Sequence, residues 1–348
     1  MSNTIMSDNN RETMNITVII IIILLMGIAF LAAFLVKNVI LPKRGAASLD
    51  QLDRNKLLKT IRAAKAVIEK DPKNAEAHYM LGKAYLADKR EEQAFREYRS
   101  VSRLGIGGKN IPETEYRETI AALYAKFHEE EEALKEYILL IKLHPENPEY
   151  YFLAGKLFSN RNQGNLAEQY FRKAISLNHR EGRYHLELGM LYYLSKRLKE
   201  AGGEFEASLK INPADAQSLL YMGKVYKETK DYTKAIPYLE KAAREPEHKL
   251  KALVELGGCY MSLKMLDKAI PELERAVNII EDEAEPDSLY ARYFLAMCYE
   301  KKCDFGRAVA LWEKIYAKKK NFRDVGEKLT HYSEYRQEDL GKETPGRS

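Results

Sequence analysis

Cysteine, tryptophan and long runs of like charge are scarce in this chain of 348 residues. Its three cysteines, Cys259, Cys298 and Cys303, form no CxxC pair, so we expect neither a disulfide framework nor a zinc site and interpret all three as small buried residues. The 56 basic and 51 acidic residues are interspersed, and the net charge of +5 forms no basic arm. We therefore expect no nucleic-acid partner.

Motifs of catalysis and cofactor binding are also lacking. His128 is followed by four glutamates, but Glu132 stands where an HExxH zinc motif needs its second histidine. The glycine-rich stretch at 105–109 has the wrong spacing for a phosphate-binding loop, and no strand is expected before it. We therefore predict no enzyme activity, no cofactor and no metal site. A catalytic protein with a site of another kind is the alternative.

One long apolar run lies near the N-terminus. Residues 16–36 carry no charge, and as a helix they would extend about 31 Å, the thickness of the hydrocarbon core of a bilayer. A buried helix of a soluble protein would show a polar face, which the isoleucines at 19–23 do not. The run is longer than the apolar part of a usual signal peptide, and no small-x-small cleavage site follows it before Lys37. We predict an uncleaved transmembrane helix at 16–36, in contact with lipid, after a tail at 1–15.

The charges beside this run bear on its orientation. Arg11 and the terminal amine precede it, and basic residues at 37, 43 and 44 follow it. The positive-inside rule, by a margin of one or two charges, places the rest of the chain in the cytoplasm beneath a cell (inner) membrane, and a periplasmic placement stays open. Ala29 and Ala33 have the small-xxx-small spacing of paired transmembrane helices, so a homo-oligomer also stays open.

The remainder of the chain is periodic. After a linker at 37–48 and an amphipathic helix predicted at 49–72, a small residue recurs at separations of 39, 34, 34, 34, 34 and 39 residues. The small residues are Gly82, Ala121, Gly155, Gly189, Gly223, Gly257 and Ala296. An aromatic residue stands three positions after each small residue, an alanine nine positions after that, and a large apolar residue four positions later.

These intervals predict pairs of antiparallel helices. We expect the small residue and the alanine where the two backbones come closest, and the aromatic residues between successive pairs. Pro145 and Pro213 should end second helices. Pro237 and Pro271 should lie in the first turn of a second helix, where proline is tolerated. The insertions at 105–112 and 281–287 are expected to be surface loops.

This order of small, aromatic, alanine, large and proline residues resembles the tetratricopeptide repeat (TPR) family over residues 75–320. The resemblance implies an all-α fold, a right-handed superhelix of about seven helical hairpins. The helix at 49–72 would be a half-repeat, a helix at 321–338 would cap the stack, and the polar tail at 339–348 is expected to be disordered. With its transmembrane helix the chain looks like a bacterial-type membrane-anchored TPR protein.

In that family the first helices line a concave surface that binds extended or helical segments of other proteins. The resemblance therefore implies partner-binding residues at three positions before and one position after the small residues, and one turn further on. They are Tyr79, Lys83, Phe152, Lys156, Leu186, Met190, Tyr193, Leu220, Lys224, Val254, Met261, Tyr293 and Met297. The asparagine of the carboxylate-binding members is missing from these positions.

An apolar strip interrupted by three lysines suits a partner that alternates apolar and acidic side chains. The alternative is that the lysines are solvated side chains of a helix face and that the methionines only pack. The sequence thus predicts a scaffold or adaptor that recruits or assembles proteins at a membrane. A periplasm-facing assembly factor of an envelope or flagellar-motor structure is the alternative within this class.

Overall fold

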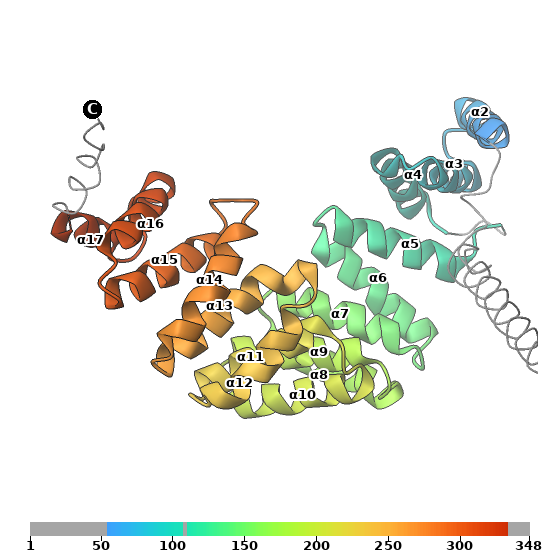
Figure 1. Ribbon diagram of the computed structural model, residues 1–348. Coiled ribbons are helices and arrows are strands. Elements are labelled where there is room, and N and C mark those ends of the chain that lie inside the picture. The colour runs from blue at the N-terminus through green and yellow to red at the C-terminus, as the bar shows by residue number, and fades with distance from the viewer. Residues whose placement is uncertain (1–53, 107–109, 333–348) are drawn as a thin grey trace, which may run out of the picture. The chain divides into compact units, whose positions relative to one another are not determined.

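The computed structural model describes residues 54–106 and 110–332, which form sixteen helices and no strand (Figure 1). The predicted all-α fold is therefore confirmed over this part of the chain. The predicted tail at 1–15, the transmembrane helix at 16–36, the linker at 37–48 and the tail at 339–348 lie outside the described residues. None of the described helices combines the length and the apolar character needed to cross a bilayer.

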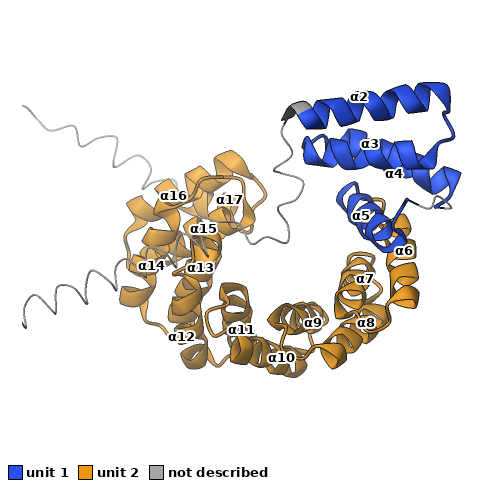
Figure 2. Cartoon of the chain, turned by 90° about the vertical axis from the view of Figure 1, so that its right-hand side faces the viewer, with its two compact units in different colours: residues 1–128 blue, residues 129–348 orange. Residues whose placement is uncertain are grey.

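The chain divides into two compact units, residues 1–128 and 129–348 (Figure 2). The helices of unit 1 are α2 (Arg54–Lys70), α3 (Ala75–Ala87), α4 (Glu91–Leu104) and α5 (Glu113–Lys126). Helices α3 and α4 form a hairpin, α2 packs on α3, and α5 packs on α4. Leu57 and Ile61 of α2 are buried in one cluster with Leu81 and Tyr85 of α3.

Unit 2 contains a row of five hairpins. Its helices are α6 (Glu130–Leu143), α7 (Pro148–Asn160), α8 (Gly164–Leu177), α9 (Gly182–Leu194), α10 (Leu198–Ile211), α11 (Ala216–Glu228), α12 (Tyr232–Ala242), α13 (Pro246–Ser262), α14 (Leu266–Asn278), α15 (Pro286–Lys301), α16 (Phe305–Lys318) and α17 (Val325–His331). The pairs α7/α8, α9/α10, α11/α12, α13/α14 and α15/α16 are the hairpins. We call the odd-numbered members first helices and the even-numbered members second helices.

The row of hairpins in unit 2 is curved. Each first helix contacts the next first helix as well as its own second helix. The first helices therefore lie on the inner side of the curve, and the second helices lie on the outer side (Figure 2). We call the exposed surface of α7, α9, α11, α13 and α15 the inner face. Helix α17 packs on α16 at the end of the row, within the predicted capping helix, where Tyr332 stacks on Trp312 with ring centroids 5.6 Å apart.

In α7, α9, α11 and α13, the glycine at the small position makes room for a large side chain of the second helix of the same hairpin. A Cβ atom on Gly189 would lie 2.6 Å from the ring of Phe205, and one on Gly257 would lie 2.5 Å from Leu273. Phe205 and Leu273 are fully buried. The close approach expected at the small residue is therefore present, and its partner is the large apolar residue of the repeat.

The tyrosines of the aromatic position also join one hairpin to the next. Tyr192 donates a hydrogen bond to Glu168 of the preceding second helix at 2.8 Å, and Tyr299 donates to Glu274 in the same way. Glu168 also accepts a hydrogen bond from Arg197 at 2.7 Å. Burial raises the pKa of Glu168, but the hydrogen bonds from Arg197, Tyr192 and Arg172 outweigh it and lower that pKa to about 2.

The turns after the first helices share one backbone conformation. Seven residues after each small residue, φ lies between 58° and 64°. These residues are Lys89, His128, Asn162, Lys196, Lys230, Lys264 and Cys303. None is glycine, although a residue with a side chain costs about 1–2 kcal/mol in this region. The second helices α6 and α10 end two residues before Pro145 and Pro213, as expected.

Three local expectations are wrong. Pro237 and Pro271 are the sixth residues of α12 and α14, beyond the first turn, so each removes one backbone hydrogen bond from its helix. Cys303 is exposed because it occupies the tight turn after α15, whereas Cys259 and Cys298 are buried as expected. The insertion expected at 281–287 ends earlier, because α15 already begins at Pro286.

Candidate partner-binding surface

The residues predicted to bind a partner fall into two groups. Seven are at most 9% exposed, and their side chains serve the packing between repeats: Tyr79, Phe152, Leu186, Tyr193, Leu220, Val254 and Tyr293. Six reach the surface: Lys83, Lys156, Met190, Lys224, Met261 and Met297. The position three residues before the small residue is buried because it meets the next hairpin; the ring of Phe152 lies 4.8 Å from that of Tyr184. The expected apolar strip is therefore mostly interior, and binding by the six surface residues stays a prediction.

The three lysines predicted on this surface each face a glutamate of a following first helix. Lys83 Nζ lies 2.6 Å from Glu115 Oε1 within unit 1. In unit 2, Lys156 Nζ lies 3.0 Å from Glu187 Oε1. An acidic partner would have to compete with these carboxylates, which sequence reasoning missed. The pairs of unit 2 could have been predicted from the repeat spacing. Each pair joins the residue directly after one small residue to the residue two positions before the next small residue.

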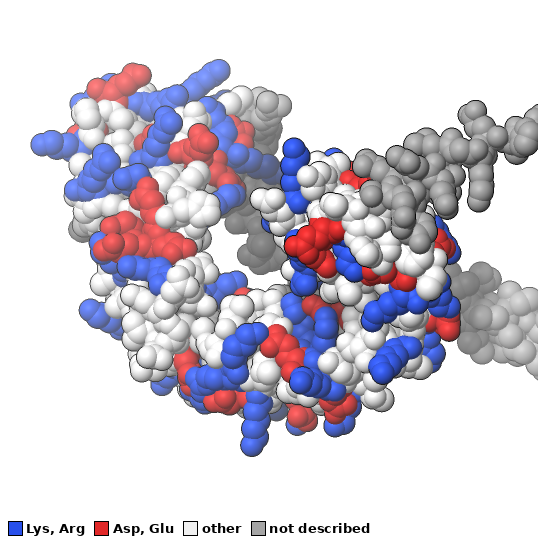
Figure 3. Space-filling view, turned by 90° about the vertical axis from the view of Figure 1, so that its left-hand side faces the viewer, with Lys and Arg blue, Asp and Glu red and all other residues white. Residues whose placement is uncertain are grey.

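Charged and apolar positions alternate along the inner face. Lysine and glutamate bridge α7 to α9 and α11 to α13. Between these two bridges, at the equivalent positions of the repeat, α9 carries Met190 and α11 carries Tyr221. Between α13 and α15, Gly258 faces Phe294, whose ring would lie 3.9 Å from a Cβ atom on the glycine. Figure 3 shows basic and acidic side chains side by side over the face it presents, so neither sign dominates there.

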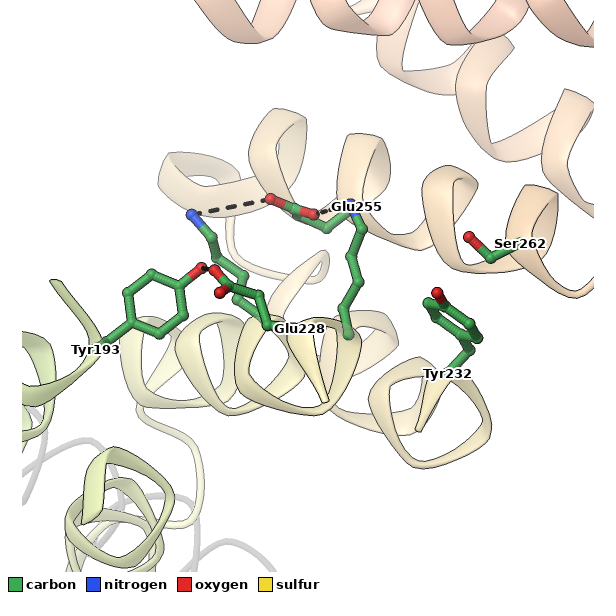
Figure 4. Close-up of a pocket in the computed structure, with 7 residues that line it drawn as sticks. Tyr193, Glu228, Tyr232, Glu255 and Ser262 are labelled. Carbon is green, nitrogen blue, oxygen red and sulfur yellow. Dashed lines mark hydrogen bonds and ion pairs between the residues drawn. The ribbon is translucent and has the colours of Figure 1, made fainter. Parts of the chain in front are cut away.

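A pocket of about 230 Å³ opens beside α11 and α13 (Figure 4). Its lining residues are Tyr193, Lys224, Lys227, Glu228, Tyr232, Glu255 and Ser262. The carboxylate of Glu255 lies between two ammonium groups: Lys227 Nζ is 2.5 Å from Oε2, and Lys224 Nζ is 3.8 Å from Oε1. The volume lies below the range of roughly 300–1,000 Å³ that is typical of small-molecule sites. The pocket therefore suits one side chain of a partner.

Aromatic rings position the charged groups of the pocket. Lys224 Nζ lies 5.6 Å from the ring centroid of Tyr193 and 5.2 Å from that of Tyr221, which is cation–π geometry. The hydroxyl of Tyr193 donates to Glu228, which also accepts a hydrogen bond from Lys196 at 2.8 Å. Burial and the carboxylate of Glu228 raise the pKa of Tyr193, so this hydroxyl stays a donor at neutral pH.

The charged residues that line the pocket balance one another, Lys224 and Lys227 against Glu228 and Glu255. Lys196, outside the lining, is paired with Glu228. Burial raises the pKa of Asp287 at the start of α15, against the opposing effect of Lys251 and Lys224.

The described residues offer little metal or thiol chemistry. Over 54–106 and 110–332, no three His, Cys, Asp or Glu side chains are grouped so that they could hold a metal ion. Burial raises the pKa of Cys259 and of Cys298 to about 11. Both thiols are therefore protonated and poorly reactive at neutral pH.

Comparison with known proteins identifies the repeats. Residues 63–96, 152–216 and 226–285 match family models described as tetratricopeptide repeat. The chain therefore contains tetratricopeptide repeats, and proteins built from them generally mediate protein–protein interactions. No curated protein matches the sequence significantly.

Solved structures share the fold at low sequence identity. A tetratricopeptide repeat protein from Parabacteroides merdae has a TM-score of 0.52 and 13% identity over 78% of this chain and 99% of its own. A chain of the APC/C hetero-tetramer Cut9–Hcn1 has a TM-score of 0.54 and 16% identity over 79% of this chain and 52% of its own. YrrB, described as a TPR protein with an unusual peptide-binding site, has a TM-score of 0.47 and 21% identity over 57% of this chain and 97% of its own. The first two similarities concern the fold alone.

Proposed function

We propose that this protein is a non-catalytic scaffold, anchored in a membrane by residues 16–36, that binds segments of partner proteins on its inner face and gathers them into a complex. The observation that carries the proposal is the inner face itself, where partly buried methionines, paired charges and a pocket of side-chain size follow one another along consecutive first helices. A surface of this kind suits an extended or helical protein segment.

Photo-crosslinking in cells tests the binding surface. A photoreactive amino acid placed at Met190 or Met297 of the inner face is expected to capture partner proteins. Leu166 and Ile211 are matched controls, because both are 39% exposed and lie on second helices. Capture at the control positions alone would refute binding on the inner face.

The anchor and its orientation are tested together in intact cells. The full-length chain should stay with membranes in a carbonate wash, and its release would refute the anchor. Cys303 is exposed whereas Cys259 and Cys298 are buried, so Cys303 is a native reporter of topology. With the repeats in the cytoplasm, an impermeant maleimide should label the chain only after lysis, and Cys303→Ser should remove the label. Labelling before lysis would favour the periplasmic assembly factor.

A further inference from the structure

Lys224 is paired differently from Lys156 and Lys227, two other lysines of the inner face. Lys156 and Lys227 place their Nζ atoms 3.0 Å and 2.5 Å from carboxylate oxygens, within hydrogen-bond distance. Lys224 Nζ lies 3.8 Å from Glu255, beyond that distance. Because Glu255 is shared with Lys227, it neutralises only one of the two ammonium groups. The ammonium group of Lys224 therefore keeps donor capacity for a further acceptor.

The ammonium group of Lys224 is also held in place before any partner arrives. The rings of Tyr193 and Tyr221 flank it, and its side chain is 29% exposed. Fixing a long lysine side chain in advance lowers the entropy lost on binding. In this partly desolvated position a charge-assisted hydrogen bond to a carboxylate is stronger than one made in open solvent.

The neighbouring positions indicate what lies on either side of that carboxylate. Met190 and Tyr221 line the inner face on one side of the pocket, and Phe294 and Met297 line it on the other. Packed helices lie roughly 8–10 Å apart, and an extended chain advances about 3.3 Å per residue. An extended segment that crosses the first helices thus advances about three residues from one helix to the next.

We infer that the pocket binds the carboxylate of a glutamate or aspartate side chain in an extended partner segment, which carries an apolar side chain three residues before it and another three residues after it. Lys224 donates to this carboxylate. The donor capacity left at Lys224 and the side-chain volume of the pocket both favour this occupant. The inference rests on the proposed function and specifies the chemistry of the partner.

Fluorescence anisotropy with the full-length chain in detergent tests the inference. The probe is a labelled nine-residue peptide of serine, with leucine, glutamate and phenylalanine at its second, fifth and eighth positions. We expect saturable binding, weakened about tenfold when glutamine replaces the glutamate, as loss of one charge-assisted hydrogen bond implies. Lys224→Gln should cause the same loss, and combining both changes should add little.

Two control variants separate charge from folding. Lys224→Arg keeps the charge and should restore most of the affinity, while Lys241→Gln removes an exposed lysine of the second helix α12 and should leave the affinity unchanged. Circular dichroism of each variant checks that its helices are intact. An equal loss of affinity in Lys224→Gln and in Lys241→Gln would overturn the assignment to Lys224.

Several outcomes would overturn the inference and leave the proposed function standing. The glutamate peptide could fail to bind, the glutamine peptide could bind equally well, or Lys224→Gln could leave the affinity unchanged. If crosslinking at Met190 still captures partners, any of these results overturns the inference alone. Binding of a phosphoserine peptide without binding of the glutamate peptide would replace the carboxylate by a phosphate. Absence of crosslinking anywhere on the inner face would remove the proposed function as well.

Discussion

Glycine-to-alanine substitution should have opposite effects at two positions of one hairpin. Gly189 of α9 faces Phe205, and a Cβ atom there would lie 2.6 Å from the ring. Gly203 of α10 has no atom within 4 Å of such a Cβ atom. Alanine is favoured over glycine in a helix by about 1 kcal/mol at either place. The difference between the two variants therefore isolates the steric cost at Gly189.

The magnitude follows from the burial of Phe205. Its side chain is fully buried and has no room to withdraw, so overpacking should cost about 2 kcal/mol, within the usual range. After the gain in helix propensity, Gly189→Ala should destabilise the hairpin by about 1 kcal/mol, and Gly203→Ala should stabilise it by about 0.5–1 kcal/mol. In a Phe205→Ala background the clash is gone, so Gly189→Ala should become stabilising by about 1 kcal/mol.

Hydrogen exchange of the amides of α9 and α10 is the appropriate assay, because a row of hairpins can open locally and a single global midpoint can hide the change. The protection of these two helices should fall in Gly189→Ala and rise in Gly203→Ala. Equal stabilisation by both substitutions would show that Phe205 does not press on Gly189. That result would refute the packing assigned to Gly189 in this hairpin.

Two further predictions concern stability. Glu168→Gln should destabilise the chain by about 1–2 kcal/mol above pH 4.5. The pKa of Glu168 is about 2 in the folded state, and the usual value is 4.5. This stabilisation is therefore present above pH 4.5 and is lost as the pH falls toward 2. Urea unfolding midpoints of both proteins measured against pH check this, and a difference that does not change with pH would contradict it. Lys264→Gly should stabilise the chain by about 0.5 kcal/mol, since glycine adopts positive φ without the steric cost. Asn162→Gly should gain less, and equal shifts in thermal unfolding would argue against strain at Lys264.

Spacing in the sequence was enough to predict the helical hairpins, and it failed at their turns. Positive φ favours glycine or asparagine, yet Lys196 and Lys230 adopt it, because helices packed on both sides dictate the turn. Of the seven turn residues, only His128 and Asn162 are of types enriched at positive φ. The start of α12 at Tyr232 differs for another reason, because proline is best tolerated in the first turn and Pro237 therefore indicates a later start.

The candidate surface was predicted by position but not by exposure. Phe152 and Leu186 are apolar residues on first helices, and the sequence alone does not tell whether such side chains meet a partner or the next hairpin. The distance between hairpins decides this, and it is a tertiary property. Lys156 and Glu187 are 31 residues apart, so their pairing follows only once the register of successive first helices is known.

Pairing of charges on the inner face bears directly on selectivity. A row of unpaired lysines would attract any acidic chain through long-range attraction. Lys156 already has Glu187 at 3.0 Å, so an acidic side chain placed there must displace a carboxylate of the protein and gains little. At Lys224 the nearest carboxylate is shared and lies 3.8 Å away, so an added acceptor gains a hydrogen bond without displacing one. The built-in glutamates thus favour recognition of charge at Lys224 over Lys156, and the apolar positions on either side then set the register in which a partner segment can lie.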